Sequence, residues 1–180
     1  METPILESER LTYIPVSLKH LSKDYVAWLN DPDVYKFLET RGNYTFDKLK
    51  RFLKECELTP KLFWAIHLKS NNLHIGNIKI DPINVNHSIG EYGIMMGRKT
   101  EWGKGYAKEA TERVIDFSFN EIKLRKITLG VVADNTVAVN LYRKLKFKDE
   151  GLYKNHVFYD NKYYDVIRMA IFNPSFSYDD

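Results

Sequence analysis

Apolar and polar positions recur at two different spacings along this chain, and these spacings mark out helices and strands. Apolar residues at helical spacing follow three residues that can cap a helix, Ser17, Thr45 and Asn135. The longest such stretch covers about 105–122. Short runs rich in β-branched and aromatic residues predict seven strands. These are 10–16, 63–68, 74–80, 89–96, 126–132, 151–159 and 163–172.

The order of these elements predicts the fold class. It runs strand, two helices, three strands, helix, strand, helix, two strands, which predicts an α/β (α+β) domain with a mixed, mostly antiparallel seven-stranded sheet flanked by helices. The wide apolar face of the 105–122 helix suits a helix that lies on a sheet. Because no linker, repeat or low-complexity stretch interrupts the chain, we expect one domain over 1–180, with a loose tail at 173–180.

The composition excludes several classes of protein. With 180 residues, 44% apolar and 28% charged, the chain is typical of a globular protein with a full core. The formal net charge of +3 is too small to predict binding to nucleic acid. No apolar run approaches the ~20 residues that span a bilayer. The single cysteine, Cys56, allows no internal disulfide, so we expect a reducing, cytoplasmic location.

A glycine-rich turn between the 89–96 strand and the 105–122 helix carries the most chemical information. It reads Trp102-Gly103-Lys104-Gly105-Tyr106-Ala107. The first N–H groups of a helix have no intrahelical partner and lie at the positive end of its dipole. The glycines remove side chains that would keep an anion from those groups, so the turn predicts a phosphate site. Taken alone, the same glycines also fit a tight connection between a strand and a helix.

A second segment agrees with the first. A strand ends at Asp134, and the helix that follows begins Asn135-Thr-Val-Ala-Val-Asn140-Leu-Tyr142. In this order and spacing, the two segments resemble the GNAT superfamily of N-acetyltransferases, and more closely the branch that includes ribosomal-protein N-terminal acetyltransferases of the RimJ/RimL kind. The resemblance covers nearly the whole chain. It implies a GNAT-like fold with a splay between the fourth and fifth predicted strands, 89–96 and 126–132.

The same resemblance implies acetyl-CoA as cosubstrate and no metal. The glycine-rich turn would hold the pyrophosphate of coenzyme A, through Trp102, Gly103, Lys104, Gly105, Tyr106 and Ala107. The strand backbone at Ile94, Met95 and Met96 would pair with the pantetheine arm, which Asn135 and Asn140 would also contact. The chain departs from the family at Thr100, where Gln or Arg is common.

Two residues are candidates for proton transfer by this resemblance. Tyr142 would face the sulfur and act as general acid, since the ordinary pKa of a tyrosine, about 10, lies near that of a thiol, about 8.5. Its alternative role is packing on the apolar face of its helix. Glu91 would be the base that takes the proton of the amine, directly or through water, and its alternative role is that of an exposed strand carboxylate. Backbone N–H groups near Met95 and Met96 would stabilise the oxyanion.

The acceptor amine is the least determined part of the prediction. The segment from Trp28 to Arg41 resembles the acceptor side of GNAT enzymes that acetylate nucleotide-linked amino sugars for surface glycans. Aromatic side chains would stack on a sugar or base, Arg41 would meet a diphosphate, and His156 would border the pocket from the last hairpin. The aromatic candidates are Tyr35, Tyr44, Trp64 and Tyr92. Their alternative role is to fill the core.

Two other functions stay open from the sequence. The acceptor amine can instead belong to a peptide or protein N-terminus, as in the ribosomal branch. The chain can also bind acetyl-CoA without catalysis, as a sensor or partner module. The many aromatic residues further suggest a homodimer.

Overall fold

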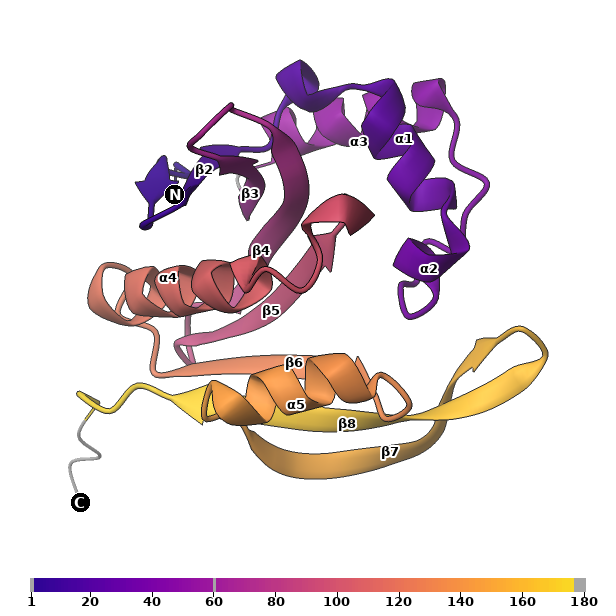
Figure 1. Ribbon diagram of the computed structural model, residues 1–180. Helices are drawn as coiled ribbons and strands as arrows, with labels where there is room; N and C mark the ends of the chain where they lie inside the picture. The colour runs from indigo at the N-terminus through magenta and orange to yellow at the C-terminus, as the bar shows by residue number, and fades with distance from the viewer. Residues whose placement is uncertain (1, 60, 177–180) are drawn as a thin grey trace. The chain divides into compact units, whose positions relative to one another are not determined.

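The computed structural model describes residues 2–59 and 61–176, which form two compact units. The described residues of the first unit lie within 1–81 and 93–113, and those of the second unit lie within 82–92 and 114–180. Each unit is therefore built from two stretches of the chain. Figure 1 shows the elements, whose bounds are given next.

The strands are β1 (Leu6–Glu7), β2 (Leu11–Pro15), β3 (Leu62–Leu68), β4 (His74–Asn84), β5 (Ile89–Met96), β6 (Lys126–Val132), β7 (Lys148–Tyr159) and β8 (Lys162–Phe172). The α-helices are α1 (Lys23–Asn30), α2 (Pro32–Tyr35), α3 (Phe46–Leu58), α4 (Tyr106–Asn120) and α5 (Thr136–Lys144). Two short 3-10 helices are η1 (Leu18–His20) and η2 (Lys99–Glu101).

The strands form a mixed, mostly antiparallel sheet, as predicted. Their order is β1-β2-β3-β4-β5-β6-β8-β7, and β5 pairs with β6 in parallel. Within the described residues the sheet has eight strands rather than seven, because Leu6 and Glu7 pair with Tyr13 and Thr12 at its edge. Two residues are too few to give a periodic signal. The parallel pairing of β5 with β6 runs from Ile89–Lys126 to Glu91–Thr128.

Ser17 stands at the start of a helical turn, but the helix expected after it does not run on without a break. The chain makes the single turn η1 instead, in which the Ser17 N–H donates to Nδ1 of His20 at 3.1 Å. Helix α1 then starts afresh, capped by Ser22, whose Oγ accepts the Tyr25 N–H at 3.1 Å. Apolar spacing alone did not show that Ser17 and Ser22 each start a helix of their own.

The other two predicted caps are confirmed. Oγ1 of Thr45 accepts the Lys48 N–H at 3.1 Å, and Oδ1 of Asn135 accepts the Ala138 N–H at 3.3 Å. Pro60, which was expected to follow the second helix, lies outside the described residues.

The start of the predicted loose tail is held in place. Asn173 is buried, and its Nδ2 donates to the carbonyls of Phe119 at 3.3 Å and Leu124 at 3.1 Å. This amide satisfies two carbonyls near the end of α4, so the chain is fixed there. Residues 177–180 lie outside the described part.

Strand β7 at the edge of the sheet is irregular. Its antiparallel register with β8 shifts between Asp149 and Gly151, and again between Tyr153 and Val157. Asp165 supports the second irregularity, because its Oδ1 accepts the Asn155 N–H at 2.7 Å. Each shift adds residues to β7 and bends it.

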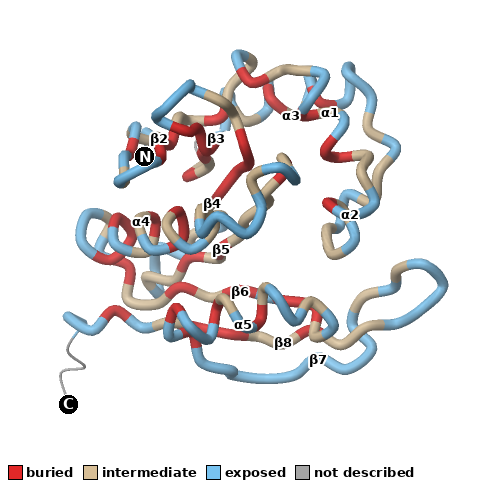
Figure 2. Tube along the Cα trace, in the orientation of Figure 1, coloured by how far each residue is buried: buried red, intermediate tan, exposed pale blue. Residues whose placement is uncertain are grey.

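The core of the first unit lies between helices α1 and α3 and the strands β2 and β3. Figure 2 shows buried positions along these elements. The buried residues that pack together here are Val16, Tyr25, Trp28, Leu29, Val34, Leu49, Leu53 and Ala65. Burial of these side chains is the main driving force for this part of the fold.

Three histidines of the first unit also lie close together. The ring centroids of His67 and His74 are 5.1 Å apart, and that of His20 is 5.4 Å from each. Nε2 of His74 donates to the Gly76 carbonyl and to Oδ1 of Asn77, both at 3.0 Å. Burial lowers the pKa of His74 to about 3, and burial also lowers the pKa of His20. The rings of His20 and His74 are therefore neutral at physiological pH.

We predict that this cluster makes the protein sensitive to acid. The unfolded chain takes up protons on His20 and His74 below about pH 6.5, whereas folded His74 does so only near pH 3. Stability is thus lost as the pH falls from about 6.5 toward 3, by at most about 1.4 kcal/mol per pH unit for each histidine. The free energy of unfolding, measured in urea at several pH values, should fall less steeply in His74→Gln than in the wild type. The exposed His87→Gln is the matched control, and equal slopes in all three proteins would refute the prediction.

Candidate functional site

The glycine-rich turn connects η2 to α4 within the first unit. Gly103 has φ of 77° and Gly105 has φ of 84°, a region that side-chain-bearing residues rarely adopt. A Cβ built at Gly103 would meet no atom within 4 Å, so the turn faces open space there. Nε1 of Trp102 donates to the Met96 carbonyl at 2.8 Å, which anchors the turn to the end of β5.

Helix α4 begins directly after this turn. The Glu109 N–H donates to the Gly105 carbonyl at 3.1 Å. The N–H groups before it, from Tyr106 onward, have no carbonyl four residues back within the helix. These donors and the positive end of the helix dipole lie at an exposed turn, which is the chemistry of an anion site.

Arg10 braces this turn, although sequence reasoning did not select it. Its Nη1 donates to the Lys104 carbonyl at 3.0 Å, its Nε donates to Oε2 of Glu109 at 2.7 Å, and its guanidinium lies 4.5 Å from the centre of the Tyr106 ring. Burial raises the pKa of Glu109, but hydrogen bonds from Arg10 and Ser8 outweigh it and the pKa is lowered. The negative charge in the first turn of α4 is thereby compensated.

The end of β5 is packed closely against its neighbours in the first unit. The carbonyl of Ile75 accepts both the Gly97 N–H at 3.0 Å and the Arg98 N–H at 3.1 Å. A Cβ on Gly76 would lie 2.4 Å from the Met95 carbonyl oxygen, and one on Gly97 would lie 2.2 Å from the Trp28 ring. These two glycines therefore fix where Met95 and Met96 lie.

The segment from α1 to α2 is tied to the residues that follow β5. Nη2 of Arg98 pairs with Asp24 at 2.5 Å, and Nζ of Lys99 pairs with Asp31 and Asp33, both at 2.8 Å. Trp28 is buried here, under Gly97. Within the first unit, these ion pairs therefore hold the predicted acceptor segment against the residues that follow β5.

The other aromatic candidates of the first unit have different environments. Trp64 is fully buried and its Nε1 donates to the Pro4 carbonyl at 2.7 Å, so the expectation that it stacks on a ligand is corrected: it is a core residue. Arg41 lies 5.3 Å from the centre of the Tyr35 ring and donates from Nη1 to the Lys36 carbonyl at 2.8 Å. The Tyr44 N–H donates to Oδ1 of Asn30 at 2.8 Å.

Tyr142 lies in an aromatic cluster of the second unit, where α5 lies along β6 and β8 (Figure 1). Its ring centroid is 5.7 Å from that of Tyr92 and 5.8 Å from that of Phe147. Burial raises the pKa of Tyr142 to about 12, against a hydrogen bond with Tyr92 that lowers it. Tyr92 is itself buried and so does not offer its face for stacking. Asn135 caps α5, and Asn140 is exposed on the same helix.

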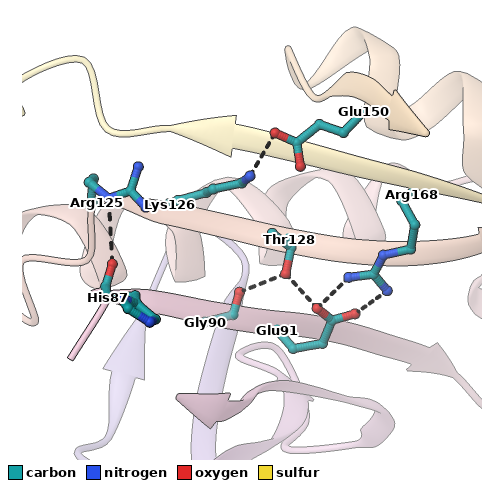
Figure 3. A network of polar contacts seen from close by, with 8 residues as sticks. All are labelled: His87, Gly90, Glu91, Arg125, Lys126, Thr128, Glu150 and Arg168. Atoms are coloured by element: carbon teal, nitrogen blue, oxygen red, sulfur yellow. Dashed lines mark hydrogen bonds and ion pairs between the residues drawn. The ribbon is translucent and has the colours of Figure 1, made fainter. Parts of the chain in front are cut away.

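Glu91 is bound on two sides within the second unit (Figure 3). Nη1 and Nη2 of Arg168 donate to Oε1 and Oε2 of Glu91, both at 2.8 Å. Oγ1 of Thr128 donates to Oε2 at 2.5 Å. The predicted base is therefore half of a bidentate ion pair, a partner that the sequence did not reveal.

His156 projects from the irregular part of β7. It is exposed, and its ring centroid is 4.9 Å from that of Tyr153. Over residues 2–59 and 61–176, no three His, Cys, Asp or Glu side chains come together in a way that would hold a metal ion. None of the described helices is both long enough and apolar enough to cross a membrane.

Comparison with known proteins places this geometry in a family. Residues 10–148 match the family described as acetyltransferase (GNAT) domain. Spermidine N(1)-acetyltransferase of Vibrio cholerae is 34% identical over 133 residues, which cover 73% of this chain and 76% of the relative. An uncharacterized N-acetyltransferase, p20 of Bacillus licheniformis, is 27% identical over 98% of this chain and 99% of its own length.

Solved structures share the fold. The spermidine N-acetyltransferase from Vibrio cholerae, in complex with CoA and spermine, superposes with a TM-score of 0.83. It is 26% identical, over 92% of this chain and 97% of that one. Since the family match spans most of the chain, the protein belongs to the GNAT acetyltransferases, which transfer an acetyl group from acetyl-CoA to an amine.

Proposed function

We propose that this enzyme acetylates a primary amine of an aliphatic polyamine or a similar small cation. The observation that carries the proposal is the 34% identity to a spermidine N(1)-acetyltransferase over nearly three quarters of the chain. The local geometry agrees, because several residues expected to bind a nucleotide-linked sugar are otherwise engaged. Trp64 and Tyr92 are buried, and Arg41 donates to a main-chain carbonyl.

The glycine-rich turn fits the pyrophosphate of coenzyme A. Its two glycines have positive φ, its outer side is open, and the helix behind it supplies N–H donors. In this proposal the residues from Trp102 to Ala107 bind the phosphates. The backbone of Ile94, Met95 and Met96 binds the pantetheine arm, and the contacts of Asn135 and Asn140 with that arm stay a prediction from the sequence. Acetyl-CoA then supplies the acetyl group as a thioester.

We predict that Gly105→Ala weakens binding of coenzyme A about tenfold or more. The substitution strains a backbone with φ of 84° and turns N–H groups away from the phosphates. Calorimetry with coenzyme A measures the affinity. Gly151→Ala, at a strand glycine with no atom within 4 Å of its built Cβ, is the control and should bind as the wild type does. Equal affinity in the Gly105 variant would count against the phosphate site.

Tyr142 is proposed as the general acid that protonates the departing sulfur. Its environment keeps the hydroxyl protonated, because the pKa of about 12 lies above any physiological pH. Burial of the departing thiolate raises the pKa of the thiol that it forms, which brings that pKa closer to the pKa of Tyr142 and favours the transfer. Glu91 is proposed to take the proton of the acceptor amine, directly or through water.

We predict that Tyr142→Phe lowers kcat about 10²-fold or more while the KM for acetyl-CoA changes little. The substitution removes one hydroxyl and leaves the ring packed against Tyr92 and Phe147. Steady-state kinetics that follow free thiol measure both constants. Because Tyr142 keeps its proton, its ionisation should not lower the wild-type rate at any pH below about 11. The exposed Tyr163→Phe is the control, and an unchanged kcat in the Tyr142 variant would remove this residue from the mechanism.

The acceptors predicted from the sequence can be tested in one screen of amines, described below. A nucleotide-linked amino sugar and a peptide N-terminus remain untested predictions, as do the homodimer and the cytoplasmic location. The idea of a non-catalytic acetyl-CoA module gives way to the family assignment.

We predict that spermidine and spermine give the highest kcat/KM in a screen of amines. A nucleotide-linked amino sugar and short peptides with free N-termini, assayed at equal concentration, should give values at least tenfold lower. Release of thiol from acetyl-CoA is the readout, and mass spectrometry identifies the acetylated product. Faster turnover of the sugar or a peptide would replace the polyamine proposal with the corresponding alternative.

A further inference from the structure

The Glu91–Arg168 pair joins two strands that are not neighbours in the sheet. Glu91 lies on β5 and Arg168 on β8, and β6 runs between them. The registers place Thr128 of β6 beside Glu91, and Gly130 of β6 beside Arg168. The guanidinium of Arg168 must therefore cross β6 to reach the carboxylate (Figure 3).

Gly130 makes this crossing possible. A Cβ at this position would lie 2.9 Å from Nη1 of Arg168 and 3.3 Å from a methyl carbon of Val166. Contacts below about 3 Å are not tolerated, so any larger residue would displace the guanidinium. Gly130 does not have a positive φ, so its backbone conformation does not require glycine. The space that the missing side chain leaves above β6 explains why glycine stands here.

The surroundings of the pair keep it charged. Arg168 is partly buried, and its hydrogen bonds with Glu91 raise its pKa, as do Tyr153 and Glu150 nearby. The next cation on this face, Lys126, is engaged with Glu150 at 2.6 Å. Hydrogen bonds to a carboxylate that has an opposite charge beside it favour its ionised form.

Glu91 also lines a hollow of the second unit. The hollow measures about 550 Å³. Its wall comprises Pro82, Ile83, Asn84, Val85, Asn86, Ile89, Glu91 and Thr128. Thr128, the second residue that binds the Glu91 carboxylate, thus lies on the same wall. The Glu91 carboxylate, with its hydrogen bonds from Arg168 and Thr128, therefore lies on the wall of this hollow.

We propose that Arg168 is a positioning residue for acetyl transfer: it crosses Gly130 to hold Glu91 ionised and in one orientation, and so sets the pH range in which Glu91 takes the proton of the acceptor amine. The step transfers one proton from an ammonium group to the Glu91 carboxylate and leaves a neutral amine. This inference rests on the proposed role of Glu91 in the function above.

Replacement of Arg168 tests the proposal. In Arg168→Gln, the acidic limb of the pH profile of kcat/KM should move to higher pH by about one unit or more, because Glu91 loses the cation that favours its ionised form. Arg168→Lys keeps the charge but loses the bidentate hydrogen bonds, so its acidic limb should move less. Gly130→Ala leaves every charge in place and should shift the limb in the same direction. The KM for acetyl-CoA should not change in any of them.

Lys126→Gln is the matched control, since it removes a cation from the same face of the sheet without touching Glu91. Its acidic limb should stay where the wild type has it. An unmoved limb in both Arg168→Gln and Gly130→Ala would overturn the proposal, as would an equal shift in the control.

A second measurement separates this inference from the proposed function. The carboxyl-carbon NMR signal of Glu91, assigned with Glu91→Gln, reports its ionisation without turnover. In the wild type the signal should titrate at lower pH than in Arg168→Gln, and titration at the same pH in both would overturn the inference. If the wild type acetylates no amine, the proposed function fails while this comparison still decides whether Arg168 holds Glu91 ionised.

Discussion

The backbone amides at the start of α4 work as an anion site only if nothing in the protein occupies them. Two features of the first unit meet this constraint. The glycines of the turn adopt positive φ and leave its outer side open. Arg10 binds the Glu109 carboxylate and the Lys104 carbonyl from a distant part of the sequence. With its one acidic group in the first turn compensated, the helix retains its attraction for phosphate.

Local signals allowed much of the fold to be predicted. Strand 89–96 was placed with its observed bounds, and the caps at Thr45 and Asn135 follow from one side chain and the residues just after it. The break after Ser17 has a local cause too, since Ser17 and Ser22 both suit the cap position: Ser17 heads the single turn η1, and Ser22 caps α1. The two-residue strand β1 gave no pattern, because it exists only through its partner β2.

The candidate site was harder to predict, because its supporting contacts are not local. Arg10 and Glu109 lie far apart in the sequence, as do Glu91 and Arg168. Motif spacing selects candidate ligand-binding residues, but it gives no information about the residues that hold them in place. Trp64 shows the opposite error: an aromatic side chain has the same appearance in a sequence whether it stacks on a ligand or fills a core.

The irregular register of β7 has a consequence for how copies of this protein behave at high concentration. This strand is twelve residues long and ends the sheet, so a regular β7 would present a straight row of unpaired amides and carbonyls to any passing strand. The two shifts against β8 bend that row and interrupt its repeat. A deletion that straightened β7 would therefore favour edge-to-edge aggregation.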